Sequence, residues 1–311
     1  GGGSALLPAP IDGVSLADKQ TVTRLLMHGG ATINELNCVR KQLSRIKGGG
    51  LARAAKQGTL ITLVISDVIG DPLDVIASGP TVDDESTPEE AIAVLKRLVP
   101  DTAQMPESVM TALKRKAEHG PVAPPIDSSR VHNVTLGRNQ VAVDAAAARA
   151  HELGFQVETE SEQEGIAAEF GRELTRRCLA LRGGDSPLPT CLISGGEPTV
   201  RLAKIDQPRK GGRNQELVLA ACDELGTDDG RGLVILSGGT DGEDGPTDAA
   251  GAWLDAAVLR DMRSKRLDPK SFLAINNSYP FFQQTGSLLL TGPTHTNVMD
   301  LRVALIDPRG A

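Results

Sequence analysis

Short apolar segments alternate with helix-forming segments along this chain, and that alternation restricts the fold to the α/β class. The continuous run at 60–65, Leu-Ile-Thr-Leu-Val-Ile, predicts a strand that is buried on both faces. Further strands are predicted at 131–136, 190–193, 233–236 and 301–306. Because 311 residues exceed one ordinary core, we expect two α/β domains with a cleft between them.

Capping residues predict where several helices begin. Ser15 and Asp18 form a capping box ahead of a helix that ends near Gly29. Asn34 predicts the cap of a second helix, 35–47, whose C-terminal half is basic. Its lysines could contact an anion, or they could simply complement the helix dipole.

A polar, proline-bearing stretch at 119–129 predicts the boundary between two domains. We place the first domain at residues 1–127 and the second at 128–311. Beyond this stretch the pattern of strands and helices starts again, with helices expected at 140–153 and 165–181.

Two glycine-containing segments near the C-terminal end combine an exposed backbone with fixed charges. They are 211–216, Gly-Gly-Arg-Asn-Gln-Glu, and 237–248, Ser-Gly-Gly-Thr-Asp-Gly-Glu-Asp-Gly-Pro-Thr-Asp. The arginine of the first, Arg213, lies at a predicted helix start, where phosphate binds favourably. The aspartates of the second suit Mg²⁺, so the two segments together predict phosphoryl transfer.

Glycine turns that follow predicted strands add to this hypothesis. The segments 194–197 and 237–240 both follow apolar strands, and Gly1 to Ser4 could be the end of a third such turn. Turns of this kind bring backbone N–H groups close to an anion, although each alone is more often only a tight turn. Asp67 follows the strand at 60–65, where it could bind a ligand or equally form a turn.

Composition and absent motifs exclude several other functions. A net charge of −7 and 2% aromatic residues disfavour nucleic acid and anionic membranes as partners. The sequence has no P-loop, no dinucleotide fingerprint and no nucleophile elbow, and its four cysteines show no metal-ligand spacing. No apolar run is long enough for a membrane span, so we expect a soluble, cytoplasmic protein with a small-molecule partner.

These motifs resemble those of class II glycerate kinases, the family whose C-terminal part is called the MOFRL domain, and above all its animal members. The resemblance implies a kinase, dependent on ATP and Mg²⁺, that converts D-glycerate to phosphoglycerate, usually the 2-phosphate. It also implies an active site between an N-terminal Rossmann-like domain, here incomplete, and a C-terminal MOFRL-type domain. The matching segments are 1–10, 37–50, 65–81, 194–200, 211–216, 236–253 and 290–300.

The resemblance places the family's catalytic arginine on Arg213. We expect Asp241 to act with it in catalysis, and Asp241 and Asp67 to hold Mg²⁺. The residues expected to contact phosphate or the glycerate carboxylate are Gly2, Gly3, Ser4, Lys41, Lys47, Ser194, Gly195, Gly196, Glu197, Asn214, Ser237, Gly238, Gly239, Thr240 and Asn297.

The chain departs from the family pattern at several places. The family usually has glycine at the place of His295, so a positive φ there would strain the turn, and it usually has aspartate at the place of Asn277. Family members also carry an N-terminal segment with a lysine thought to be catalytic, and we expect this chain to be inactive or impaired without it. A homodimer and a mitochondrial address carried by that segment stay open.

Two alternatives to the kinase remain open. One is an oxidoreductase that acts on a hydroxy acid such as hydroxypyruvate, although the absent dinucleotide fingerprint counts against it. The other is a fragment that binds its ligand without catalysis.

Overall fold

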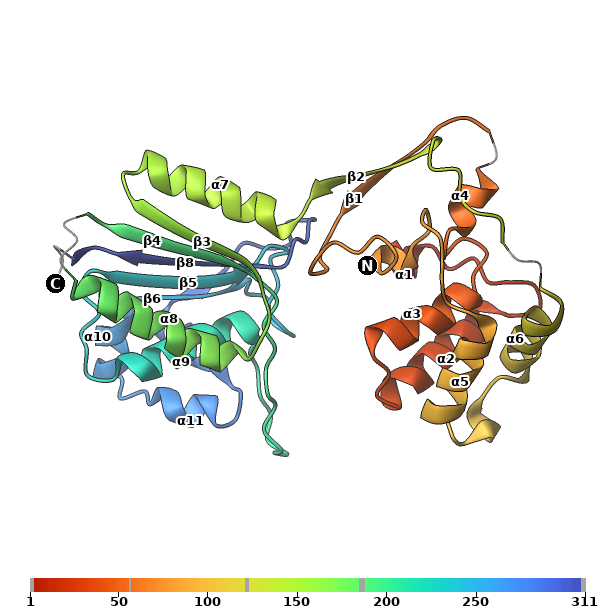
Figure 1. Ribbon diagram of the computed structural model, residues 1–311. Coiled ribbons are helices and arrows are strands. Elements are labelled where there is room, and N and C mark those ends of the chain that lie inside the picture. Colours follow the sequence, from red (N-terminus) through yellow and green to blue (C-terminus); the bar gives the residue numbers. More distant parts are fainter. Residues whose placement is uncertain (1–2, 56, 121–122, 185–187, 309–311) are drawn as a thin grey trace. The chain divides into compact units, whose positions relative to one another are not determined.

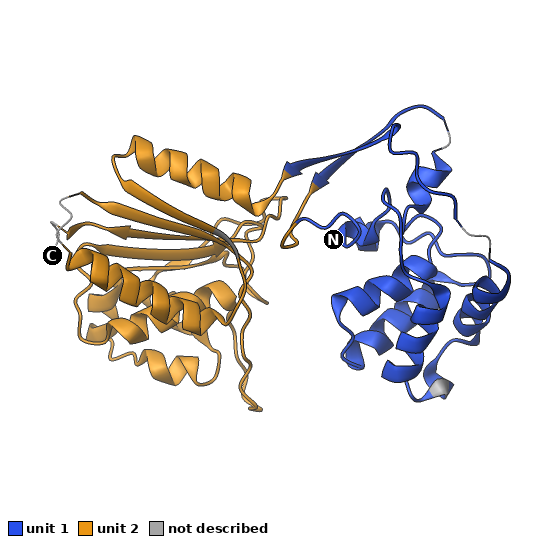
Figure 2. Cartoon of the chain, viewed as in Figure 1, with its two compact units in different colours: residues 1–64, 71–136 blue, residues 65–70, 137–311 orange. Residues whose placement is uncertain are grey.

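The computed structural model describes residues 3–55, 57–120, 123–184 and 188–308, and the chain forms two compact units (Figure 1). The first comprises Gly1–Val64 and Asp71–Leu136, and the second comprises Ile65–Gly70 and Gly137–Ala311 (Figure 2). The α/β class is therefore confirmed, while the domain limit at residue 127 stays a prediction. Among the described residues, no helix combines the length and apolarity that a membrane span requires.

The first unit is largely helical. Its helices pack around a core that includes Val22, Leu26, Val39 and Leu95. The capping box of Ser15 and Asp18 is present, as predicted. The elements are α1 (Gly3–Leu6), α2 (Leu16–His28), α3 (Ile33–Gln42), α4 (Gly50–Ala54), η1 (Ile76–Ser78), α5 (Pro88–Leu98), η2 (Thr102–Gln104) and α6 (Glu107–His119).

The predicted second helix is shorter than expected. Thr32 rather than Asn34 is its cap, because Thr32 and Glu35 form a complete capping box. The helix ends at Gln42, since the Ser44 hydroxyl accepts hydrogen bonds from the backbone of residues 46 and 47. Such local bonds compete with the helical pattern, so Lys47 lies outside the helix.

The apolar run at 60–65 forms β1 (Leu60–Ile65), which pairs with β2 (Val131–Gly137) in a two-stranded sheet. The prediction that this strand is buried on both faces is wrong. Ile61, Leu63 and Ile65 are each more than half exposed, and Val64 is buried. The family resemblance implies an incomplete Rossmann-like domain here, and β1 and β2 are the strands that the described part of the first unit contains.

The second unit is built on a six-stranded sheet of order β3-β4-β8-β5-β6-β7. Strand β3 is parallel to β4, and β8 is antiparallel to both β4 and β5, which therefore run in the same direction. The strands are β3 (Gln156–Gln163), β4 (Thr190–Gly196), β5 (Leu233–Gly239), β6 (Gly251–Asp255), β7 (Leu288–Leu289) and β8 (Asp300–Ile306).

Helices cover both faces of this sheet (Figure 1). On one face, α7 packs against Cys191, Ile193 and the odd-numbered residues of β8. On the other face, α8 and α9 pack against Leu192, Ile235 and Ala304. The helices of this unit are α7 (Asn139–Glu152), α8 (Ala167–Arg182), α9 (Arg213–Leu225), α10 (Ala256–Ser264), α11 (Pro269–Leu273) and α12 (Ser278–Thr285).

The glycines expected in turns after β4 and β5 are in fact the last residues of these strands. We call Ser194–Gly196 and Ser237–Gly239 the glycine ends of β4 and β5. Both glycine ends pair with the start of β8, so that Asp300 lies opposite Gly196 on one side and Gly239 on the other. This register brings the glycine ends of β4 and β5 together beside Asp300, where the central strands of the sheet meet.

Candidate functional site

Arg213 is the first residue of α9, and two carboxylates hold its guanidinium group. Its Nε donates to Asp300 Oδ2 at 2.6 Å, and its Nη2 donates to Asp300 Oδ1 at 3.0 Å. Its Nη1 lies 3.0 Å from Glu197 Oε1. Asp300 is fully buried, whereas Arg213 and Glu197 are partly exposed. Arg213, the predicted catalytic arginine, is thus held by a buried carboxylate while part of its side chain stays accessible to solvent.

The charges around Arg213 are predominantly negative. Burial lowers the pKa of Arg213, but its hydrogen bonds with Asp300 and the charges of Asp300 and Glu197 raise it overall. Burial raises the pKa of Glu197, and the charges of Asp300, Asp67 and Asp241 raise it further, in opposition to Arg213. Three carboxylates, those of Asp300, Glu197 and Asp244, therefore act on the guanidinium, and a bound anion would need additional positive charge.

The N-terminus of α9 is already capped by a carboxylate. Asp244 accepts hydrogen bonds from the backbone of Asn214 at 3.0 Å and of Gln215 at 2.9 Å. Burial raises the pKa of Asp244 to about 6 despite these hydrogen bonds. The Asn214 side chain is buried between Asp244 and Ser237, whose hydroxyl donates to it at 2.5 Å. Asn214 and Ser237 therefore bind each other, and the helix N-terminus does not offer these N–H groups to a phosphate.

Three backbone N–H groups at or directly after the glycine ends are also occupied. Those of Glu197, Gly239 and Thr240 donate to the carbonyl groups of Gln163, Ala250 and Met299, at 3.1, 2.8 and 3.0 Å. These three N–H groups are therefore already paired within the chain, and the anion cradle stays a prediction. Among the side chains at this place, Arg213 is partly exposed and can donate to an anion.

The segments that flank the glycine ends are tied together by Thr240. Its hydroxyl donates to Met299 O at 2.6 Å and accepts from Val298 N at 2.9 Å. Asp241 follows, and its side chain accepts from Glu243 N at 3.0 Å. Thr240 therefore holds the segment 297–299 in place and leaves Asp241 at the surface of the turn.

Asp67 and Asn297, which are far apart in the sequence, lie together in the second unit. Asn297 Nδ2 donates to Asp67 Oδ2 at 3.1 Å, and Asn297 Oδ1 accepts from Met299 N at 3.0 Å. Both predicted metal ligands, Asp67 and Asp241, act on the pKa of Glu197, so they lie around the same carboxylate. In the described part of the chain, no three His, Cys, Asp or Glu residues form a preassembled metal site.

The predicted anion contacts of the first unit fall into two separate places. Lys47 is buried, and its Nζ donates to Ser4 Oγ at 2.8 Å, to Ser4 O at 3.1 Å and to Ala77 O at 3.1 Å. Burial lowers the pKa of Lys47 to about 8, and the charges of Lys19 and Arg40 lower it in the same direction. Gly3 lies in α1 beside Ser4, while Gly2 lies outside the described residues.

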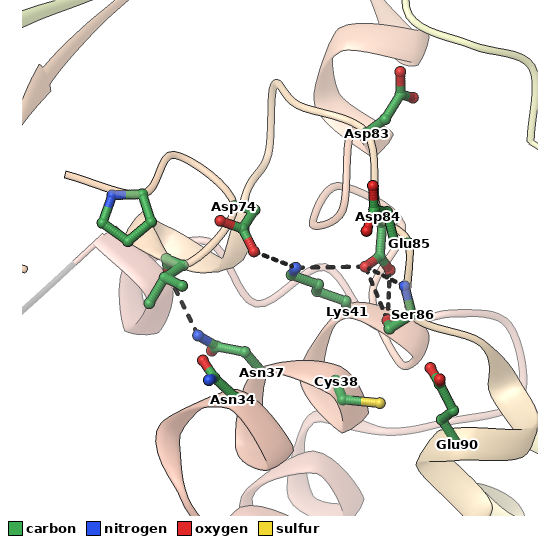
Figure 3. A pocket seen from close by; sticks show the side chains of 12 residues that line it. Asn34, Asn37, Cys38, Lys41, Asp74, Asp83, Asp84, Glu85, Ser86 and Glu90 are labelled. Atoms are coloured by element: carbon green, nitrogen blue, oxygen red, sulfur yellow. Dashed lines mark hydrogen bonds and ion pairs between the residues drawn. The ribbon is translucent and has the colours of Figure 1, made fainter. Parts of the chain in front are cut away.

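Lys41 lies instead in an acidic pocket of about 840 Å³ (Figure 3). Its Nζ is 3.5 Å from Asp74 and 3.4 Å from Asp84, and Asp83, Glu85 and Glu90 also line this pocket. Two carboxylates therefore already pair with Lys41 in acidic surroundings, and its contact with an anion stays a prediction.

The two departures at the C-terminal end differ in their effect on the structure. His295 has a φ of 60°, in the left-handed region that favours glycine. This is the positive φ at which a histidine was expected to strain the turn. Asn277 caps α12, and its Oδ1 accepts from Lys210 N at 2.8 Å. An aspartate would accept the same bond, so asparagine is compatible with this turn.

Sequence reasoning did not identify Asn139 and Arg302 as part of this site. Asn139 donates to the carbonyl groups of Val298 and Asp300, and it lies so close to Gly195 that a Cβ there would be 1.7 Å from Asn139 Oδ1. Arg302 donates to Ser194 and Gly195. The signal for Arg302 was a charged residue within the predicted strand 301–306, whose other residues are apolar.

Two family models match this chain, one in its N-terminal part and one in its C-terminal part. Residues 1–114 match the model "Domain of unknown function (DUF4147)", and residues 190–300 match the MOFRL family. The glycerate kinase of Macaca fascicularis is 41% identical over 99% of this chain and 88% of its own length. The human glycerate kinase is 41% identical over 99% of this chain, which spans 66% of that protein.

Solved structures of related proteins share the fold. The crystal structure of glycerate kinase from Thermotoga maritima matches with a TM-score of 0.85 and 40% identity, over 98% of this chain and 70% of that one. A Pyrococcus horikoshii protein matches with a TM-score of 0.82 and 39% identity, over 98% and 70%. The chain therefore belongs to the glycerate kinase family with a C-terminal MOFRL domain.

Proposed function

We propose that this chain transfers the γ-phosphoryl group of ATP to D-glycerate and forms 2-phosphoglycerate. Its relatives include the D-glycerate 2-kinase of Thermotoga maritima, which is 40% identical over 98% of this chain and 70% of that enzyme. The observation that carries the proposal is the bidentate pair of Arg213 and Asp300 between the glycine ends of β4 and β5. This pair presents a fixed guanidinium at this end of the sheet.

Arg213 stabilises the charge that develops on the transferring phosphoryl group. Asp300 occupies its Nε and one N–H of Nη2, whereas Nη1 faces the partly exposed Glu197. A phosphoryl oxygen replaces Glu197 at Nη1, and the raised pKa of Glu197 favours that exchange. Preorganised donors of this kind act without reorganisation during the reaction.

Asp241 and Asp67 are the residues that would hold Mg²⁺. Both supply carboxylate oxygens, which Mg²⁺ prefers, and Asn297 orients Asp67. Mg²⁺ usually binds through one or two carboxylates together with substrate phosphates, so two aspartates suffice. The ion would neutralise negative charge on the phosphates, which the acidic surroundings of Arg213 require. Ser4 and Lys47 of the first unit stay candidates for contact with the glycerate carboxylate.

The test is the formation of ADP from Mg-ATP with and without D-glycerate. A coupled assay with enolase, which accepts 2-phosphoglycerate directly, identifies the product. Arg213→Ala is expected to lower kcat by about 10²–10³, equivalent to roughly 2.7–4 kcal/mol of barrier. Arg231→Ala is the control, because Arg231 pairs with Asp229 at the surface. Full activity of Arg213→Ala would contradict the site.

The remaining sequence predictions are tested alongside. Reduction of hydroxypyruvate with NADH, without glycerate-dependent ADP, would favour the oxidoreductase instead. Glycerate binding without any turnover would favour the binding fragment. Light scattering coupled to gel filtration tests the homodimer, and fractionation of cells tests the cytoplasmic location.

A further inference from the structure

Arg302 is a charged side chain in the interior of the second unit, with an exposed fraction of 2%. It lies in β8 opposite Ser194 on one side and Ser237 on the other. Its Nε donates to Ser194 Oγ at 2.9 Å, and its Nη2 donates to Gly195 O and, at 3.4 Å, to Gln163 Oε1. It therefore binds the glycine end of β4 from the inside.

Packing alone does not account for an arginine at this position. Ala304 and Ile306 occupy the same face of β8 and belong to the apolar core. Moving a charged group out of water costs several kcal/mol even in a relaxed protein interior. Burial lowers the pKa of Arg302 to about 10, so it remains charged at neutral pH. Its Nη1 finds no acceptor among the described residues, which adds to the cost.

The neighbour two positions before Arg302 supplies a reason for this charge. Asp300 lies on the same face of β8 and is fully buried, and its charge raises the pKa of Arg302. The carboxylate of Asp300 therefore lies in the field of two guanidinium groups, Arg213 through hydrogen bonds and Arg302 through the longer-range charge. With Arg302 present, the two arginines balance the two carboxylates that contact Arg213, Asp300 and Glu197.

The charge of Arg302 matters because this end of the sheet has few other donors for an anion. The N–H groups of Glu197, Gly239 and Thr240 are occupied. Asp244 caps the start of α9. Without Arg302, the group of Arg213, Asp300 and Glu197 would carry one net negative charge.

We propose that Arg302 is a positioning residue for phosphate binding at this site. It fixes Ser194 and Gly195 through its hydrogen bonds, and it offsets the charge of Asp300 so that Arg213 attracts an anion. This inference rests on the proposed function insofar as the anion is a phosphoryl group. It adds a residue that touches neither substrate nor the reacting atoms.

The test compares Arg302→Gln, Arg302→Lys and the control Arg182→Gln. Arg182 lies at the C-terminal end of α8, where it binds Asp228 and the Arg231 carbonyl, so its loss also removes a partly buried ion pair. The probe is inorganic phosphate, whose binding is measured by titration calorimetry. Steady-state kinetics give kcat and KM separately.

We expect Arg302→Gln to weaken phosphate binding at least 10-fold and to raise the KM for ATP more than it lowers kcat. Arg302→Lys keeps the charge, so it should bind phosphate within about 3-fold of the wild type. Arg182→Gln should leave phosphate binding unchanged. Equal losses in Arg302→Gln and Arg182→Gln, or unchanged binding in Arg302→Gln, would overturn the proposal.

If Arg302→Gln does not fold, Arg302→Lys and Ser194→Ala carry the test. Ser194→Ala removes the acceptor of Nε and should weaken phosphate binding by 3-fold to 10-fold. Wild-type binding in Ser194→Ala, together with lost binding in a folded Arg302→Lys, would contradict the proposal. Phosphate binding that depends on Arg302 without glycerate-dependent ADP would support the positioning role and contradict only the kinase.

Discussion

Replacing Asp300 with asparagine removes a negative charge from a fully buried position between two arginines. The carboxylate accepts two hydrogen bonds from Arg213, at 2.6 and 3.0 Å, and asparagine has almost the same volume. The amide oxygen can accept one of these bonds, but the amide NH₂ group then faces the second donor. The substitution therefore removes the buried counterion of Arg213 and Arg302, leaves Glu197 as the other carboxylate at Arg213, and creates no cavity.

The cost follows from the burial of this pair. Removing one partner of a buried ion pair costs about 3–5 kcal/mol, because the remaining charge is uncompensated. A unit of 150–250 residues loses about 2–4 °C of Tm for each kcal/mol. We therefore expect the Tm of the second unit to fall by roughly 6–20 °C.

Thermal unfolding followed by circular dichroism measures this loss, and a double-mutant cycle isolates the pair. Arg213→Met removes the other charge, so the double variant should be more stable than the two single losses predict. The control is Asp248→Asn, because Asp248 is exposed and its pair with Lys210 is at the surface. A loss below about 1 kcal/mol for Asp300→Asn, or strict additivity in the cycle, would refute the reasoning.

Three further predictions concern the second unit. Gly171→Ala places a Cβ 2.1 Å from the Leu217 carbonyl where α8 meets α9, so denaturant unfolding should show a loss of about 1–3 kcal/mol, whereas Gly183→Ala has room and should be nearly neutral. Burial raises the pKa of Asp244 from 3.8 to about 6, so between these pH values the folded state binds more protons than the unfolded state. The free energy of unfolding should therefore fall as the pH rises from about 4 to 6, and Asp244→Asn should remove about 3 kcal/mol of that dependence. An unchanged pH profile in Asp244→Asn would contradict this prediction. Because His295 has a φ of 60°, His295→Val should cost about 1–2 kcal/mol in the same assay, while His295→Gly should be close to neutral.

Local patterns in the sequence predicted the local structure well. The capping box at Ser15 and Asp18 is confirmed because both partners lie within one helical turn. The same rule explains the error at Asn34, since Thr32 forms the complete box with Glu35. A cap is therefore predicted best when both of its hydrogen bonds are considered together.

Burial and strand pairing were harder to predict from the sequence, because they depend on distant parts of the chain. The apolar run of β1 predicts a buried strand, yet alternate residues are exposed in its two-stranded sheet. Strand β3 was missed because Gln156–Gln163 is mostly polar and lies at the edge of the larger sheet. Its pairing with β4 stabilises it, and no local pattern reveals that pairing.

For the candidate site, too, the local motifs were predictable and the long-range contacts were not. Arg213 and the glycine motifs are evident in the sequence, but their relation depends on the register of β8 between β4 and β5. That register turns Asp300 into the partner of Arg213 and places Arg302 beneath Ser194. Glu197 was expected to bind the anion, and the structure instead pairs it with Arg213.

The arrangement around Arg213 combines one permanent partner with one exchangeable partner. Asp300 is fully buried and binds Arg213 through both carboxylate oxygens. It therefore fixes the orientation of the guanidinium group but also neutralises the positive charge of Arg213. Arg302 offsets that loss without taking a position that a ligand needs. Glu197 is partly exposed, and burial already weakens its charged form, so it is the partner that a phosphoryl oxygen can displace. An anion therefore competes with one carboxylate only, while the donor that it meets is already oriented.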